Sequence, residues 1–131
     1  MDSSEVYKRF KIAKQKFMDE IASIQASYVS SNFSFKEGDV VSVIKNRNYN
    51  RNATPILVLI ESIFFNNKGN LFEEWIYTNP SIMISGHRVD NEGYDLTFFK
   101  DSDQRIGELF RPEDVVSITT IRPKKIKRPN S

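Results

Sequence analysis

The hydrophobic positions of the first thirty residues follow a helical period. One apolar stripe steps by three or four residues through Val6, Phe10, Ala13, Phe17, Ile21, Ile24 and Tyr28. This spacing predicts an amphipathic helix over residues 3–28. The polar residues 30–32 mark the exit of the chain from the helix. Asp2 is the expected N-cap, with Glu5 as its reciprocal partner. The stripe needs a cover, and the alternatives are the rest of the chain, a second copy or a partner protein.

From residue 35 the pattern changes to short runs rich in β-branched and aromatic residues. Turn signals separate these runs at residues 37–39, 66–69 and 90–93, the last of which predicts a hairpin. A further short strand is expected over residues 105–110. Short strands at close spacing with no helix between them predict antiparallel pairing. Because open sheet edges invite association, such a set usually closes into a small barrel or a sandwich.

Two segments of this β-rich region carry a resemblance to a known superfold. The run GluGlyAspValValSerVal at 37–43 resembles the first strand of SH3-like small barrels, including the KOW and Tudor types. The run ArgProGluAspValValSerIle at 111–118 is similar to the helical turn and last strand of such barrels. The resemblance spans about 85 residues, and OB-type barrels begin in the same way. It implies an α+β, mainly β fold and no particular function, because one superfold hosts many functions.

The predicted organisation has three parts. Residues 1–32 form the N-terminal helix and linker, residues 33–121 form the barrel domain on which the helix packs, and residues 122–131 form an extended, mobile basic arm. Their charges differ: residues 1–28 hold five basic and four acidic side chains, residues 29–121 hold nine and thirteen, and the arm holds five and none. This asymmetry indicates an anionic partner for the arm.

The residue inventory excludes several chemistries. The chain has no cysteine, so disulfides, thiolate metal sites and a cysteine nucleophile are excluded. His87 is the single histidine, and no nucleophile-elbow motif accompanies it. Residues 101–108 partly match the beginning of a calcium-loop motif. Arg105 and Ile106 stand where that motif requires an oxygen ligand and a glycine, so the match fails. We therefore predict no catalytic residue, no metal site and no cofactor.

Basic residues provide the candidate contacts to nucleic acid or to an acidic partner. The arm offers Arg122, Lys124, Lys125, Lys127 and Arg128. The loop over residues 45–52 offers Lys45, Arg47, Tyr49 and Arg51 among several asparagines. Arginine and lysine bind phosphate, and tyrosine stacks on bases, so this composition suits a single strand. The acidic body opposes a duplex lying across it.

We interpret the sequence as a non-enzymatic binding module that acts in a protein assembly, as a small bacterial or phage structural or adaptor component. The candidate protein interface is the helix stripe: Val6, Phe10, Phe17, Ile21 and Ile24. A protein partner or a homo-oligomer is expected, and no membrane contact. The alternative is a nucleic-acid-binding protein that uses the arm and the 45–52 loop. The charged N-terminus predicts a cytoplasmic protein, with a virion as the second location.

Overall fold

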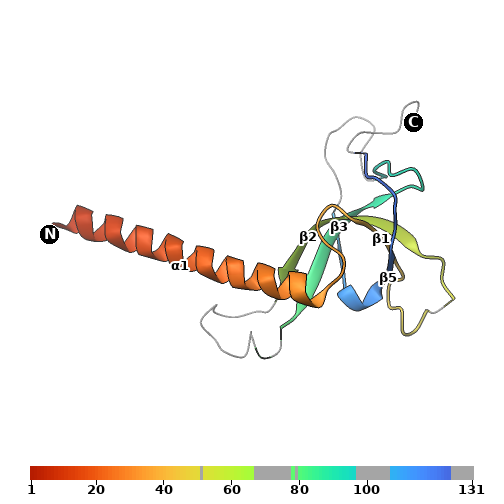
Figure 1. The fold of residues 1–131 in the computed structure, drawn as a ribbon, viewed down its shortest axis with the longest axis horizontal. Helices are drawn as coiled ribbons and strands as arrows, with labels where there is room; N and C mark the ends of the chain where they lie inside the picture. The colour runs from red at the N-terminus through yellow and green to blue at the C-terminus, as the bar shows by residue number, and fades with distance from the viewer. Residues whose placement is uncertain (51, 67–77, 79, 97–106, 125–131) are drawn as a thin grey trace. The chain divides into compact units, whose positions relative to one another are not determined.

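The computed structural model describes residues 1–50, 52–66, 78, 80–96 and 107–124. These residues form one long helix and a five-stranded antiparallel sheet, so the fold is mixed α and β and mainly β. The chain divides into two compact units, Met1–Ser34 and Phe35–Ser131 (Figure 1). The predicted packing of the helix against the sheet stays a prediction.

Helix α1 spans Ser3–Asn32 and confirms the helical pattern of the first unit. The carboxylate of Asp2 accepts a hydrogen bond from the backbone N–H of Glu5 at 2.8 Å, as the predicted N-cap requires. The Glu5 carboxylate accepts a hydrogen bond from Arg9 at 3.0 Å and so does not serve as the reciprocal partner.

The helix extends four residues beyond the predicted end at Tyr28. Ser30 donates to the Ser27 carbonyl at 3.1 Å, and Asn32 donates through its side chain to the Tyr28 carbonyl at 2.8 Å. The two side chains thus add hydrogen bonds to carbonyls in the last turns of the helix. Ser30 and Asn32, which the sequence marked as the exit, therefore support the last turn of the helix.

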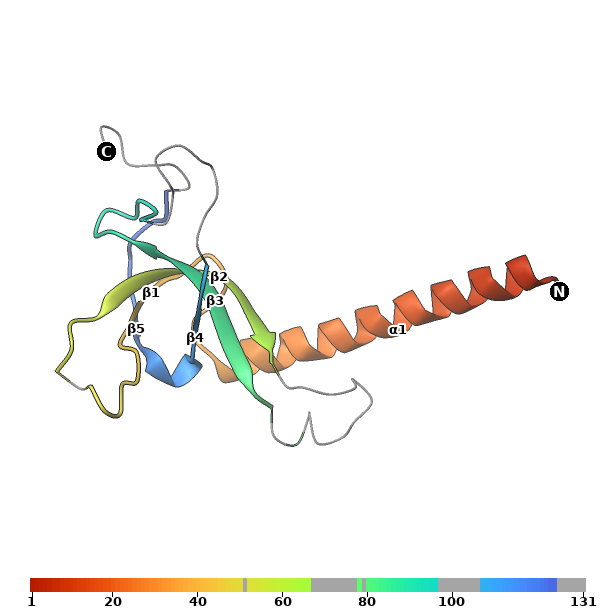
Figure 2. The same ribbon diagram turned by 180° about the vertical axis from the view of Figure 1, so that it is seen from behind.

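The sheet contains strands β1 Val40–Val43, β2 Ile56–Phe65, β3 Ile82–Val89, β4 Glu108–Phe110 and β5 Val115–Ile118. Their order across the sheet is β4-β3-β2-β1-β5, and every pairing is antiparallel (Figure 2). The short helical turn η1, Pro112–Asp114, precedes β5, as the sequence predicts. The strand pairings of the described residues leave β4 and β5 as edges, so the predicted closure into a barrel is not confirmed.

Both faces of the sheet bury apolar side chains. One face collects residues that are at most 2% exposed: Val41, Val43, Val58, Ile60, Ile84 and Phe110. The other face holds a smaller cluster of Val40, Leu59 and Val89, which Leu57 and Ile121 partly cover. The alternation along each strand places these two sets on opposite sides. The largest described core therefore lies on the first face, beside the residues that form the ion cluster described next.

Candidate interaction surfaces

The carboxylate of Glu108 holds two cations at the margin of the first face. Arg88 donates from Nε to Oε1 at 2.6 Å and from Nη2 to Oε2 at 3.1 Å. Lys45 donates from Nζ to Oε2 at 2.8 Å, and its ammonium lies 5.1 Å from the centre of the Phe110 ring. The hydrogen bonds from Arg88, with help from Lys45, lower the pKa of Glu108 to about 2 against the opposing effect of burial. Lys45, a predicted phosphate contact, is thus paired with a carboxylate of its own chain.

The start of the 45–52 loop is held by Asp114 of η1, which is buried. Its carboxylate accepts hydrogen bonds from the backbone N–H groups of Asn46 at 3.3 Å and Arg47 at 3.1 Å. Its own carbonyl accepts from the Ile44 N–H at 3.0 Å. Arg47 donates from Nη1 to the Val115 carbonyl at 3.1 Å. Arg47, also a predicted phosphate contact, therefore uses one of its guanidinium donors for a hydrogen bond to β5.

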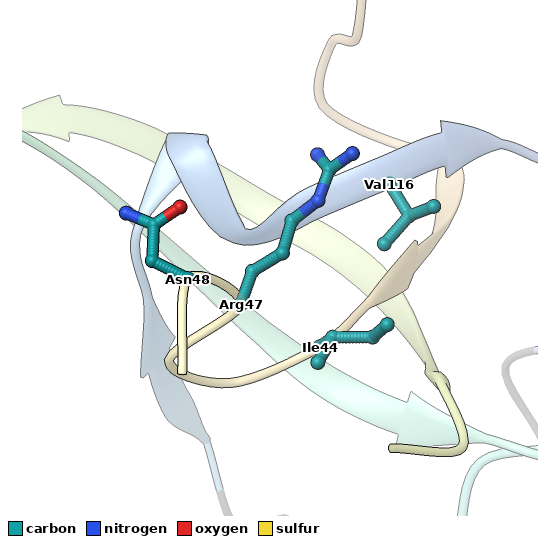
Figure 3. Close-up of a pocket in the computed structure, with 4 residues that line it drawn as sticks. All are labelled: Ile44, Arg47, Asn48 and Val116. Carbon is teal, nitrogen blue, oxygen red and sulfur yellow. The ribbon is translucent and has the colours of Figure 1, made fainter. Parts of the chain in front are cut away.

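A hollow of about 460 Å³ lies beside this loop. Its lining comprises Ile44, Arg47, Asn48 and Val116. Figure 3 shows the Arg47 side chain reaching from the loop towards β5, with Ile44 and Val116 to one side of it. Two apolar side chains beside a guanidinium offer a contact for an amphipathic group of a partner.

The remaining candidates of the loop differ in their placement. Tyr49 is 90% exposed, which a stacking residue requires. Arg51 lies outside the described residues. Within the loop, the structure therefore brings Lys45 and Arg47 to internal acceptors and leaves the Tyr49 ring at the surface.

The first residues of the basic arm are attached to the hairpin turn that the sequence predicts at residues 90–93. Gly93 donates its backbone N–H to the Asp90 carbonyl at 3.0 Å, which confirms that turn. Lys124 forms a parallel bridge with Tyr94 and donates its backbone N–H to the Gly93 carbonyl at 2.8 Å. Its ammonium donates to the Glu92 carbonyl at 2.9 Å and lies 4.4 Å from the centre of the Tyr94 ring.

This attachment places the start of the predicted arm at the 90–94 turn, and the mobility of the arm stays a prediction. Lys124 is bound through its backbone and its side chain, and Arg122 beside it is exposed. The other three basic residues of the arm, Lys125, Lys127 and Arg128, lie outside the described residues. A bound segment forms here because the Tyr94 ring and two backbone carbonyls accept the lysine, a set that composition alone does not reveal.

His87 lies on the second face of the sheet and is 5% exposed. Its Nε2 atom is 2.5 Å from Oε2 of Glu61. Glu61 sits where the pairing of β2 with β3 shifts register between Ile60 and Ser62, and such a bulge re-aims a side chain. The exposed carboxylate of Glu61 therefore orients the imidazole of His87. Sequence reasoning missed Glu61, because the pairing of β2 with β3 brings it to a histidine 26 residues away, and local pattern does not reveal that pairing.

The helix stripe of the first unit contains exposed apolar side chains. Val6 is 51% exposed, Phe10 is 65% and Ile24 is 65%. Phe17 is 40% exposed and Ile21 is half-buried. No residue of α1 is buried. The helix therefore holds most of the exposed large hydrophobic side chains of the described residues.

Three general observations bear on the kind of site. Within the described ranges, no group of three His, Cys, Asp or Glu side chains is placed to hold a metal ion. No helix in the described part of the chain combines the length and apolar character that crossing a membrane requires. Comparison with protein families, curated proteins and solved structures found no match to the chain.

Proposed function

We propose that the protein is a non-enzymatic binding module of a protein assembly, and that the apolar stripe of α1 is its contact surface. The observation that carries the proposal is a 30-residue helix of which no residue is buried. Its own unit, Met1–Ser34, contains no second element that could cover the stripe. Helix propensity alone gives an isolated helix only marginal stability. In proteins, most of the stability of a helix comes from the packing of its apolar face.

The proposed fold of the second unit is an SH3-like small barrel. Its support is a meander of β1 to β4 with β5 returning beside β1 after the turn η1. The bulge in β2 gives a further reason, because bulges let a strand bend from one side of a small barrel to the other. A barrel of this kind would act as a compact carrier for the helix and for the hollow beside Arg47.

The internal partners of the cations favour a protein over a nucleic acid as the partner. Lys45, Arg47 and Lys124 each donate to an acceptor within the chain. A phosphate would have to compete with those acceptors. All five described candidates, Tyr49 and Arg122 included, are exposed, and this exposure supports the nucleic-acid alternative.

The test asks whether the stripe belongs to the chain's own core. In the double variant Phe10→Gln/Ile24→Gln, two stripe residues become polar while helix propensity is kept. Ile12→Gln is the matched control, because Ile12 is 69% exposed and lies off the stripe. Urea unfolding is followed by the amide NMR signals of β2 and β3, at a concentration at which the chain is monomeric.

The proposal predicts that both variants keep the free energy of unfolding of the sheet within about 0.5 kcal/mol of the parent chain. A loss of about 3 kcal/mol in the double variant alone would show that the stripe packs on its own sheet and would overturn the proposal. Salt-dependent binding of a single-stranded oligonucleotide that is lost in Tyr49→Ala/Arg122→Ala would favour the nucleic-acid alternative.

A further inference from the structure

The apolar stripe of α1 is symmetric about Phe17. Counted in either direction from that residue, apolar side chains occur at four, seven and eleven positions: Ala13 and Ile21, Phe10 and Ile24, Val6 and Tyr28. All of them lie within one uninterrupted helix, Ser3–Asn32, which Figure 1 shows as straight. A two-fold axis at the level of Phe17 therefore places each of these residues opposite an apolar residue of a second, antiparallel helix.

The period of the stripe keeps it on one side of the helix along its whole length. Val6, Phe17 and Tyr28 are separated by eleven residues each, and an eleven-residue repeat gives about 3.67 residues per turn. This value is close to that of an unstrained α-helix, so the stripe drifts little around the helix axis. Two such helices can remain in contact from Val6 to Tyr28 with little supercoiling.

The charges of the helix discriminate between the two directions of pairing. The first half, residues 3–16, holds one acid, Glu5, and the five basic residues Lys8, Arg9, Lys11, Lys14 and Lys16. The second half, residues 18–32, holds Asp19 and Glu20 and no basic residue. A parallel pair would set two strongly basic halves side by side, and like charges repel. An antiparallel pair sets each basic half against an acidic one.

We infer that the stripe of α1 binds a second copy of this chain, with the two helices antiparallel and the two-fold axis near Phe17. This inference rests on the proposed function, because it names the partner of that contact surface. An isologous contact of this kind is closed: it makes a dimer, because each copy offers the same patch to the other. In the dimer, Phe10 of each helix faces Ile24 of its partner.

Single cysteines test the direction and the register, because the natural chain has no cysteine. The full-length variants Phe10→Cys and Ile24→Cys are each oxidised alone and then as an equimolar mixture. In the antiparallel pair, two copies of position 10 lie about 21 Å apart along the axis, from a rise of about 1.5 Å per residue. A disulfide needs Cα atoms within about 7 Å. Positions 10 and 24 of different copies lie within that reach.

The expected result is a mixed disulfide, which joins position 10 of one variant to position 24 of the other. It should be at least about tenfold more abundant than either self-disulfide, whereas unselective oxidation makes it only about twice as abundant. Mass spectrometry separates the species, since the two variants differ in mass. Self-disulfides from each variant alone would show parallel helices and overturn the inference. A mixture at statistical proportions would overturn the register.

If the cysteine substitutions themselves prevent pairing, sedimentation velocity on the unsubstituted chain still tests the inference. The inference predicts a species of twice the 15.2 kDa chain mass, which Phe10→Gln/Ile24→Gln dissociates and Ile12→Gln does not. A chain that stays monomeric throughout its soluble range contradicts pairing with a second copy. That result leaves the proposed function standing with a different protein as the partner, so the two failures are distinguishable.

Discussion

The Nζ atom of Lys45 lies 2.8 Å from Oε2 of Glu108, although β2 and β3 lie between β1, which Lys45 follows, and β4 in the order of the sheet. Lys45 follows β1 by two residues, and Glu108 begins β4. Strands that are three places apart in the order can meet in this way only where the sheet is strongly curved. Twist and the bulge in β2 are the physical sources of that curvature.

The first prediction concerns the pH dependence that Glu108 gives to stability. Its pKa falls from 4.5 to about 2 on folding, so its ionised form stabilises the folded state fully above pH 4.5. This contribution is lost as the pH falls towards 2. Arg88 and Lys45 are 42% and 49% exposed, and solvent screening reduces the effect to about 1 kcal/mol.

Urea midpoints measured from pH 6 to pH 3 should therefore fall more steeply for the parent chain than for Glu108→Gln. Glu113→Gln, in which an exposed carboxylate of η1 is removed, serves as the control and should keep the steep slope. Parallel curves for the parent and Glu108→Gln would contradict the role given to the two cations.

The second prediction concerns Asp114 as the anchor of the 45–52 loop. Asp114→Ala removes the acceptor of the Asn46 and Arg47 N–H groups, and we expect a loss of about 2 kcal/mol in the free energy of unfolding. Asp114→Asn keeps one acceptor oxygen and should lose less. Amide exchange of Arg47 should accelerate more than that of Ile44, since Ile44 donates to the unchanged backbone carbonyl. Equal acceleration at both amides would argue against the side-chain anchor.

Most of the secondary structure could be predicted from the sequence, because it depends on local pattern. The helix, its Asp2 cap, the turn at residues 90–93 and the turn η1 before β5 were each indicated by residues close together in the chain. The expected strand over residues 105–110 is observed as β4 at Glu108–Phe110, and residues 105–106 lie outside the described ranges.

The contacts that define the surfaces could not be predicted, because they join residues far apart. Lys45 and Glu108 are 63 positions apart, and Arg47 and the Asp114 carboxylate are 67 apart. Composition identified Lys45, Arg47 and Lys124 as cations, but it could not show that each of them donates a hydrogen bond to an acceptor within the chain. The prediction of phosphate contacts was based on the number of basic residues. In the folded chain, three of these residues donate hydrogen bonds to acceptors of the same chain.

The third prediction separates two glycines that share a backbone conformation. Gly38 and Gly93 have φ of +91° and +93°, so an alanine at either position is strained. An added Cβ meets nothing within 4 Å at Gly38, but it would lie 2.1 Å from the Arg122 carbonyl oxygen at Gly93. Gly38→Ala should therefore lower the free energy of unfolding by about 1 kcal/mol.

Gly93→Ala should lower it by about 3 kcal/mol, the upper part of the usual range for point substitutions. It should also release Lys124 from the 90–94 turn, which faster exchange of the Lys124 amide would report. If the two variants lose the same stability and the Lys124 amide stays protected in both, the attachment of the arm is not as described.

Amide hydrogen exchange of α1 as a function of chain concentration tests the central claim most directly. If the stripe is covered by another molecule, residues 6–28 of the monomeric chain should exchange rapidly, because a single helix without a packed face is marginal. Their protection should then rise at least about tenfold as the concentration increases and the dimer forms. Strong protection of these amides at every concentration, equal to that of β2 and β3, would show that the chain covers its own helix and would contradict the account.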